Sequence, residues 1–96
     1  MTVRHCWQAV DGLHARVWED EGVIYDEFSG HTHLVTSFAA ATLTQLRQQQ
    51  APLPTGYLAA QLAETLALER NEEFDAALAA NLNEFERLGL VERSQT

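Results

Sequence analysis

The first third of the chain alternates apolar and polar residues in short runs, a pattern typical of strands that bury one face. Three such runs occupy residues 13–18, 22–26 and 32–35. A polar turn joins the first two runs, and a Ser-Gly pair at 29–30 allows a hairpin between the second and the third. The pattern therefore predicts a three-stranded antiparallel β-meander.

After the meander the apolar spacing changes to every three or four residues, which indicates helices. We expect a first helix from an N-cap at Ser37 to about residue 48, because serine is a favourable N-cap residue. A second helix should begin at Pro54 or Thr55. The sequence leaves these two starting points open.

The third helix has the strongest signals in the chain. Asn71 is a suitable N-cap, and the acidic residues that follow it suit the positive end of a helix dipole. Its apolar residues recur every three or four positions at Phe74, Leu78, Leu82, Phe85 and Leu88. Gly89 should end the helix in a left-handed conformation, with Leu90 folding back as in a Schellman motif. We expect a helix of about 17 residues, followed by a frayed tail over residues 94–96.

The 96 residues carry a net charge of −8, which restricts the classes of partner. Proteins that bind nucleic acids usually present a basic face, whereas the six arginines here are scattered and lysine is absent. An acidic surface favours a basic protein or peptide partner. The length predicts one domain over residues 1–96, and no apolar run is long enough to span a membrane. The single Cys6 and the absence of a signal peptide predict a cytoplasmic protein.

The sequence offers no constellation for catalysis. His31 and His33 share one side of the third strand, but two histidines without a third ligand make a weak metal site, so we expect neither a metal nor a cofactor. Phosphate-loop, nucleophile-elbow and zinc-protease motifs are absent from the sequence. The third strand should form an open edge of the sheet, and an open edge can accept a peptide as an extra strand. We therefore expect a binding protein and no enzyme.

Six segments together resemble the PqqD-like peptide chaperones. They are WEDEGVIYD at 18–26, SGHTHLV at 29–35, FAAATL at 38–43, PL at 52–53, LAAQL at 58–62 and FERLGLV at 85–91. The resemblance covers about residues 10–92 and looks closest to the subgroup found with HPr-kinase-related proteins, the HPr-rel-A system. It implies a bacterial protein of natural-product biosynthesis with an α+β, winged-helix-like fold, in which the three-stranded antiparallel β-meander is followed by a three-helix bundle.

The resemblance also implies a function. Such chaperones bind the leader segment of a ribosomally made precursor peptide, which pairs antiparallel with the third strand and rests against the third helix, and they present it to a modifying enzyme. The implied peptide-binding residues are His31, Thr32, His33, Leu34, Val35, Thr36, Leu78, Asn81, Leu82 and Phe85. The implied partners are the precursor peptide and a peptide-modifying enzyme or an HPr-kinase-related protein.

Two other functions compete with peptide binding. Three helices that end in ERLGLVER at 86–93 also suit a winged-helix transcriptional regulator that binds DNA. The acidic residues of the third helix argue against this function, because phosphates would repel them. A structural subunit that forms a homodimer through the free sheet edge is the third hypothesis.

Overall fold

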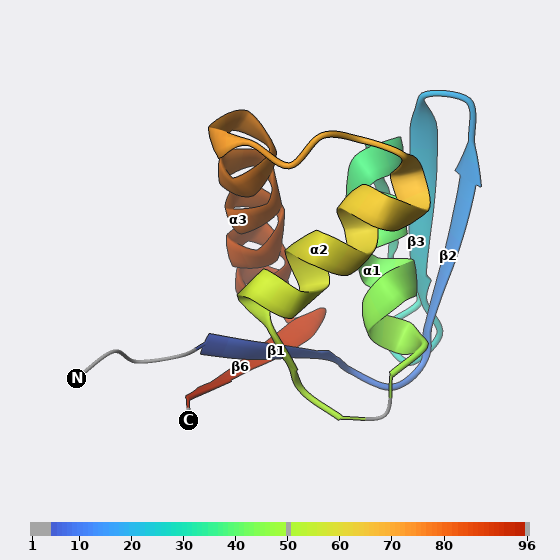
Figure 1. Cartoon of the computed structure of the whole chain (residues 1–96). Coiled ribbons are helices and arrows are strands. Elements are labelled where there is room, and N and C mark those ends of the chain that lie inside the picture. Colours follow the sequence, from blue (N-terminus) through green and yellow to red (C-terminus); the bar gives the residue numbers. More distant parts are fainter. Residues whose placement is uncertain (1–4, 50, 96) are drawn as a thin grey trace.

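The computed structural model describes residues 5–49 and 51–95 of the chain (Figure 1). The strands are β1 (His5–Ala9), β2 (Leu13–Trp18), β3 (Glu21–Asp26), β4 (Thr32–Thr36), β5 (Leu53–Pro54) and β6 (Val91–Gln95). The helices are α1 (Ser37–Arg47), α2 (Thr55–Leu66) and α3 (Glu72–Arg87). The predicted α+β class is confirmed, with an antiparallel meander of β2, β3 and β4 followed by three helices.

The structure also contains a second antiparallel sheet, in the order β5-β1-β6, which was not predicted from the sequence. In it Trp7 of β1 lies opposite Leu53 on one side and opposite Arg93 on the other. The prediction of a frayed tail was wrong for Ser94 and Gln95, because both belong to β6 and pair with β1. Thr96, the last residue of that predicted tail, lies outside the described residues.

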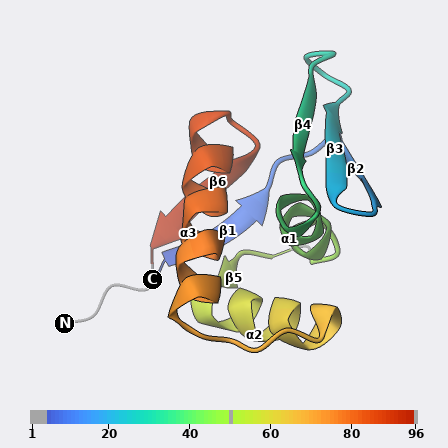
Figure 2. The same cartoon turned by 90° about the horizontal axis from the view of Figure 1, so that it is seen from above.

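Helix α1 occupies the centre of the molecule, between the two sheets and the other two helices (Figures 1 and 2). Its Leu43 is fully buried, as are Ile24 of β3, Leu58 of α2 and Leu82 of α3. These side chains belong to one hydrophobic cluster that receives residues from both sheets and all three helices. The core therefore fixes α3 relative to the meander, and this arrangement positions the site described below.

The start of α1 differs from the prediction by one residue. Thr36 is the N-cap, and its Oγ1 accepts a hydrogen bond from the backbone N–H of Ala39 at 3.1 Å. Ser37 is instead the first helical residue. Both residues are suitable caps, but Thr36 ends β4 in an extended conformation, with ψ 161°, and this places its hydroxyl over the first turn. Of the two starting points left open for α2, Thr55 is the observed one.

Both predicted ends of α3 are confirmed. The Asn71 side chain accepts a hydrogen bond from the N–H of Phe74 at 2.9 Å. At the other end Gly89 has φ +78°, and its N–H donates to the carbonyl of Glu86. The N–H of Leu90 donates to the carbonyl of Phe85, which completes the Schellman motif. The helix has 16 residues.

Within the part of the chain that the structure describes, none of the helices is long and apolar enough to cross a membrane.

Candidate functional site

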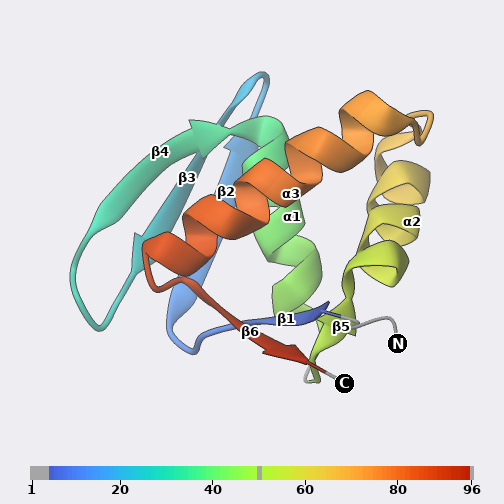
Figure 3. The same cartoon turned by 90° about the vertical axis from the view of Figure 1, so that its left-hand side faces the viewer.

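Strand β4 lies at one edge of the meander. Its register with β3 places Leu34 opposite Val23 and Thr36 opposite Glu21. Among the described residues no strand pairs with the other side of β4. The predicted open edge is thus present, and α3 runs alongside it (Figure 3).

The hydrogen bonds that flank β4 show which of its backbone groups face this edge. The N–H of Asp26 donates to the carbonyl of His31 at 2.9 Å, and the N–H of Ser37 donates to the carbonyl of Asp20 at 3.2 Å. Hydrogen-bonded pairs alternate along an antiparallel ladder, so odd-numbered residues of β4 bond to β3. The backbone groups of Thr32 and Leu34, and the N–H of Thr36, therefore face the open edge.

A groove of about 580 Å³ separates β4 from α3. It is lined by Thr32, His33, Leu34, Val35, Thr36, Ala39, Asn81, Glu84, Phe85 and Leu88. In the view from above, β4 is the meander strand nearest to α3 (Figure 2). The groove therefore combines an unpaired backbone edge on one side with a partly apolar helix face on the other.

The structure brings seven of the ten predicted site residues to this groove. These are the five residues of β4 together with Asn81 and Phe85. It places Leu78 and Leu82 elsewhere, because both side chains are buried in the core cluster. His31 lies in the loop before β4 and does not line the groove.

Three lining residues were missed by the sequence analysis: Ala39, Glu84 and Leu88. On α3 the core stripe contains Leu78, Leu82 and Phe85, and the neighbouring stripe at 81, 84 and 88 faces the groove. Residues three and four apart share a face of a helix, so this second spacing was visible in the sequence. Leu88 was the available signal in the sequence, since it shares this spacing with Asn81 and Glu84 and is apolar. In the structure 36% of its surface is exposed.

Glu84 is the charged residue of the groove wall. Arg87 donates a hydrogen bond from Nε to Glu84 Oε2 at 3.0 Å, and a second bond joins the same two side chains. These bonds lower the pKa of the Glu84 carboxyl, with a further contribution from the positive charge of Arg87. The carboxylate therefore stays ionised at neutral pH and is paired within its own helix.

His31 and His33 lie close together near the start of β4. Their ring centroids are 6.4 Å apart and their planes are almost perpendicular. Within residues 5–49 and 51–95, no three histidine, cysteine or acidic side chains converge as metal ligands would. His33 lines the groove, and His31 lies just before β4, outside the lining.

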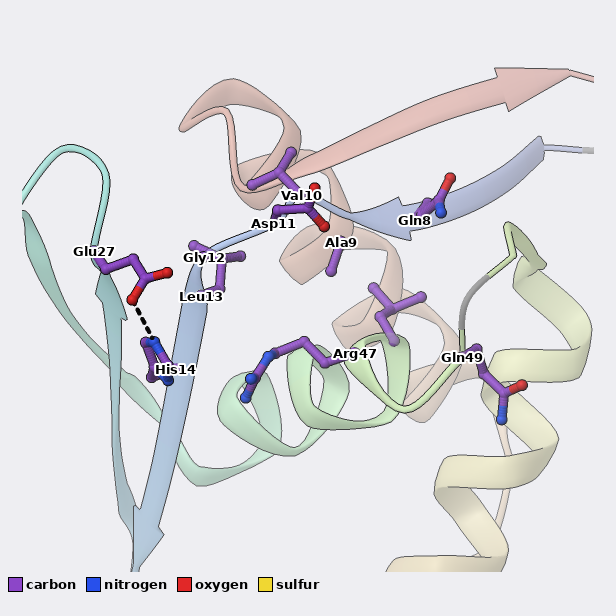
Figure 4. Close-up of a pocket in the computed structure, with 11 residues that line it drawn as sticks. Gln8, Ala9, Val10, Asp11, Gly12, Leu13, His14, Glu27, Arg47 and Gln49 are labelled. Carbon is purple, nitrogen blue, oxygen red and sulfur yellow. Dashed lines mark hydrogen bonds and ion pairs between the residues drawn. The ribbon is translucent and has the colours of Figure 1, made fainter.

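A second hollow of about 490 Å³ lies where the chain passes from β1 to β2, next to the end of α1 (Figure 4). It is lined by Gln8, Ala9, Val10, Asp11, Gly12, Leu13, His14, Glu27, Leu46, Arg47 and Gln49. His14 Nε2 and Glu27 Oε2 are 3.2 Å apart, in an exposed hydrogen bond between the two side chains. None of the ten predicted site residues lines this hollow.

Comparisons with known proteins bear on the fold. No protein-family model matches the chain, and no curated protein matches it by sequence. A solved structure, described as TbiB1 in complex with the TbiA(beta) leader peptide, superposes with a TM-score of 0.63. The match covers 88% of this chain and 94% of TbiB1, at 13% sequence identity. This chain shares the fold of TbiB1. At this identity the similarity shows the fold alone.

Proposed function

We propose that this chain is a non-catalytic peptide chaperone. It binds the leader segment of a ribosomally made precursor peptide in the groove between β4 and α3 and presents the peptide to a modifying enzyme. The observation that carries the proposal is the unpaired backbone edge of Thr32 and Leu34 beside the helix face that contains Phe85 and Leu88. An added strand would satisfy the edge, while its side chains would contact the helix.

The fold shared with TbiB1 supports this proposal, since that protein was solved in complex with a leader peptide. The PqqD-like subgroup found with HPr-kinase-related proteins remains our closer assignment, and it rests on the sequence resemblance. The same resemblance supports a bacterial, cytoplasmic protein whose second partner is the modifying enzyme or an HPr-kinase-related protein.

The exposed side of Leu34 also supports strand addition. Leu34 has 85% of its surface exposed to solvent, although it is the middle residue of β4. A neighbouring strand would place a side chain directly beside it, because directly opposed residues share one face of a sheet. An added peptide would thus cover an apolar residue that the monomer leaves in water.

The charges of α3 argue against the alternative, a DNA-binding regulator. Arg87 is paired with Glu84, and Arg93 of β6 is paired with Glu86. The first turn of α3 adds Glu72, Glu73 and Asp75. A helix with this charge would be repelled by the phosphates of a DNA groove.

The proposal is tested by an NMR titration of the labelled protein with the short precursor peptide encoded beside its gene. We expect shifts over Thr32–Thr36 and at Asn81 and Phe85. The variant Leu34→Pro removes one N–H from the open edge. It leaves the bonds to β3 intact, because the N–H of Leu34 faces away from β3 and proline is tolerated on edge strands. It should therefore remain folded and lose most of its affinity.

The matched control is Leu34→Ala, which keeps the N–H and shortens the side chain. It should retain more affinity than Leu34→Pro if main-chain pairing dominates binding. Equal affinity of the proline and alanine variants would contradict strand addition. Salt-dependent binding to duplex DNA, without any response to the peptide, would favour the regulator instead.

A further inference from the structure

The two ends of the groove differ in charge. At the Thr36 end, β4 meets the turn between β2 and β3, where Glu19, Asp20 and Glu21 are all exposed. Glu21 lies opposite Thr36 in the sheet, and the carbonyl of Asp20 accepts the N–H of Ser37. Three carboxylates therefore border this end, and among the described residues none of them takes part in an ion pair.

The Thr32 end carries histidines instead. His31 and His33 lie there, and the carboxylates of Asp26 and Glu27 lie nearby, at the end of β3 and in the turn that follows it. Asp26 accepts hydrogen bonds from the N–H groups of Phe28 at 3.0 Å and Ser29 at 3.4 Å, and Glu27 is hydrogen-bonded to His14. Both ends therefore carry carboxylates, three at the Thr36 end and two at the Thr32 end, and among the described residues only those at the Thr36 end lack a hydrogen-bond partner.

Between the two ends, the groove wall contributes little net charge. Glu84 is paired with Arg87, and the other lining residues of α3 are Asn81, Phe85 and Leu88. Helix α1, which also reaches the groove through Ala39, has no acidic residue in its first turn. The positive end of its dipole faces the same region and offsets part of the three carboxylates, equivalent to about half a charge.

The pleat of β4 determines how a ligand would face the groove. His33 and Val35 are half-buried, and His33 lies opposite the buried Ile24, so these two side chains face the core. Leu34 points to the opposite side of the sheet. The ligand residues opposite His33 and Val35 would therefore point towards α3, two positions apart, next to Phe85 and Leu88.

From these observations, and resting on the function proposed above, we infer the class of peptide that the groove selects. It is an extended segment with apolar side chains at two alternate positions and with its basic residues on the N-terminal flank. Antiparallel pairing continues the pattern of the meander and is the more stable arrangement. It places the N-terminal end of the ligand at Thr36, beside the residues Glu19, Asp20 and Glu21. The charge asymmetry would then orient the peptide as well as attract it.

The test uses two short synthetic peptides of identical composition, each with alternating threonine and leucine or valine. One carries a pair of lysines at its N-terminus and the other carries the pair at its C-terminus. At low salt we expect the first to bind about three- to tenfold more tightly, since exposed ion pairs contribute little each. The difference should shrink at high salt. A spin label on the N-terminus of the first peptide should broaden the amide signals of Glu19–Glu21 more than that of His31.

The control is a protein variant with Glu19→Gln, Asp20→Asn and Glu21→Gln, which keeps the size of each exposed side chain. It should still bind both peptides and should lose the preference between them. Equal binding of both peptides to the unaltered protein, or tighter binding of the C-terminal lysine peptide, overturns the inference while peptide binding itself stands. If neither these peptides nor the encoded precursor perturbs Thr32–Thr36, the proposed function fails, and the inference fails with it.

Discussion

The backbone N–H of Leu90 donates a hydrogen bond to the carbonyl oxygen of Phe85 at 2.8 Å, across the turn that ends α3. Phe85 lines the groove as well as the core, and Leu90 is buried immediately before β6. This single bond therefore links the wall of the candidate site to the second sheet. A substitution in the turn between Phe85 and Leu90 should therefore affect both the groove wall and the second sheet.

Gly89 stands inside this turn with φ +78°, and among the described residues no atom beyond its two chain neighbours lies within 4 Å of where its Cβ would be. The cost of Gly89→Ala should therefore come from the backbone alone, about 1–2 kcal/mol in the free energy of unfolding. Gly56→Ala is the matched control, because Gly56 also has open space but lies in α2 without a positive φ. Urea denaturation should show a loss for the first variant and none for the second.

Asn71 holds the opposite end of the same helix. Asn71→Ala should lower the free energy of unfolding by about 1 kcal/mol, since the N–H of Phe74 loses its acceptor. Asn71→Ser retains a capping oxygen and should recover most of that loss. Thermal unfolding of the three proteins checks this, and equal stability of the alanine and serine variants would argue against the cap.

The second sheet is joined to α2 by the indole of Trp7, whose Nε1 donates to Thr55 Oγ1 at 2.7 Å. Trp7 has only 4% of its surface exposed. Thr55→Val should leave this buried donor unpaired and cost about 1–3 kcal/mol. Thr55→Ser keeps the hydroxyl and should cost clearly less, which urea unfolding followed by tryptophan fluorescence can measure. A larger loss for the serine variant would contradict the role of this bond.

Gly12, between β1 and β2, combines a positive φ of +85° with the ring of Phe28 where its Cβ would lie. Gly12→Ala should destabilise the protein by more than the backbone term of about 1–2 kcal/mol, because the ring must also move. Adding Phe28→Ala to this variant should recover the steric part and leave the backbone part. Measured stabilities of both single variants and the double variant form the test. Additive losses would show that the two residues do not interact.

The Glu84–Arg87 pair gives a pH-dependent prediction. The hydrogen bond from Arg87 lowers the pKa of the Glu84 carboxyl in the folded protein. Any stabilisation from it is thus present above the unfolded-state pKa and is lost as pH falls through the folded-state pKa. Arg87→Gln should raise the pKa of Glu84 towards its ordinary value, as an NMR titration of the carboxyl carbon would show. Arg70→Gln, which breaks the separate pair with Asp75, should leave that titration unchanged.

Local signals in the sequence were sufficient for most of the secondary structure. The meander was predicted because its strands alternate with a period of two and are joined by short turns, so each pairs with its neighbour in sequence. The ends of α3 were predicted because Asn71 and Gly89 act on backbone groups a few residues away. The choice between Thr36 and Ser37 as the cap of α1 was not local, since it depends on how far β4 continues.

Tertiary structure alone decided the second sheet and the composition of the groove. Strands β5, β1 and β6 pair residues far apart in the chain, such as Trp7 with Leu53 and Arg93, and such pairing leaves little periodic signal in segments of two to five residues. The sequence showed that α3 has an apolar face that includes Leu82 and Leu88. Only packing against the core decided that Leu82 is buried and that Leu88 faces the groove, because the core fixes the rotation of the helix beside β4.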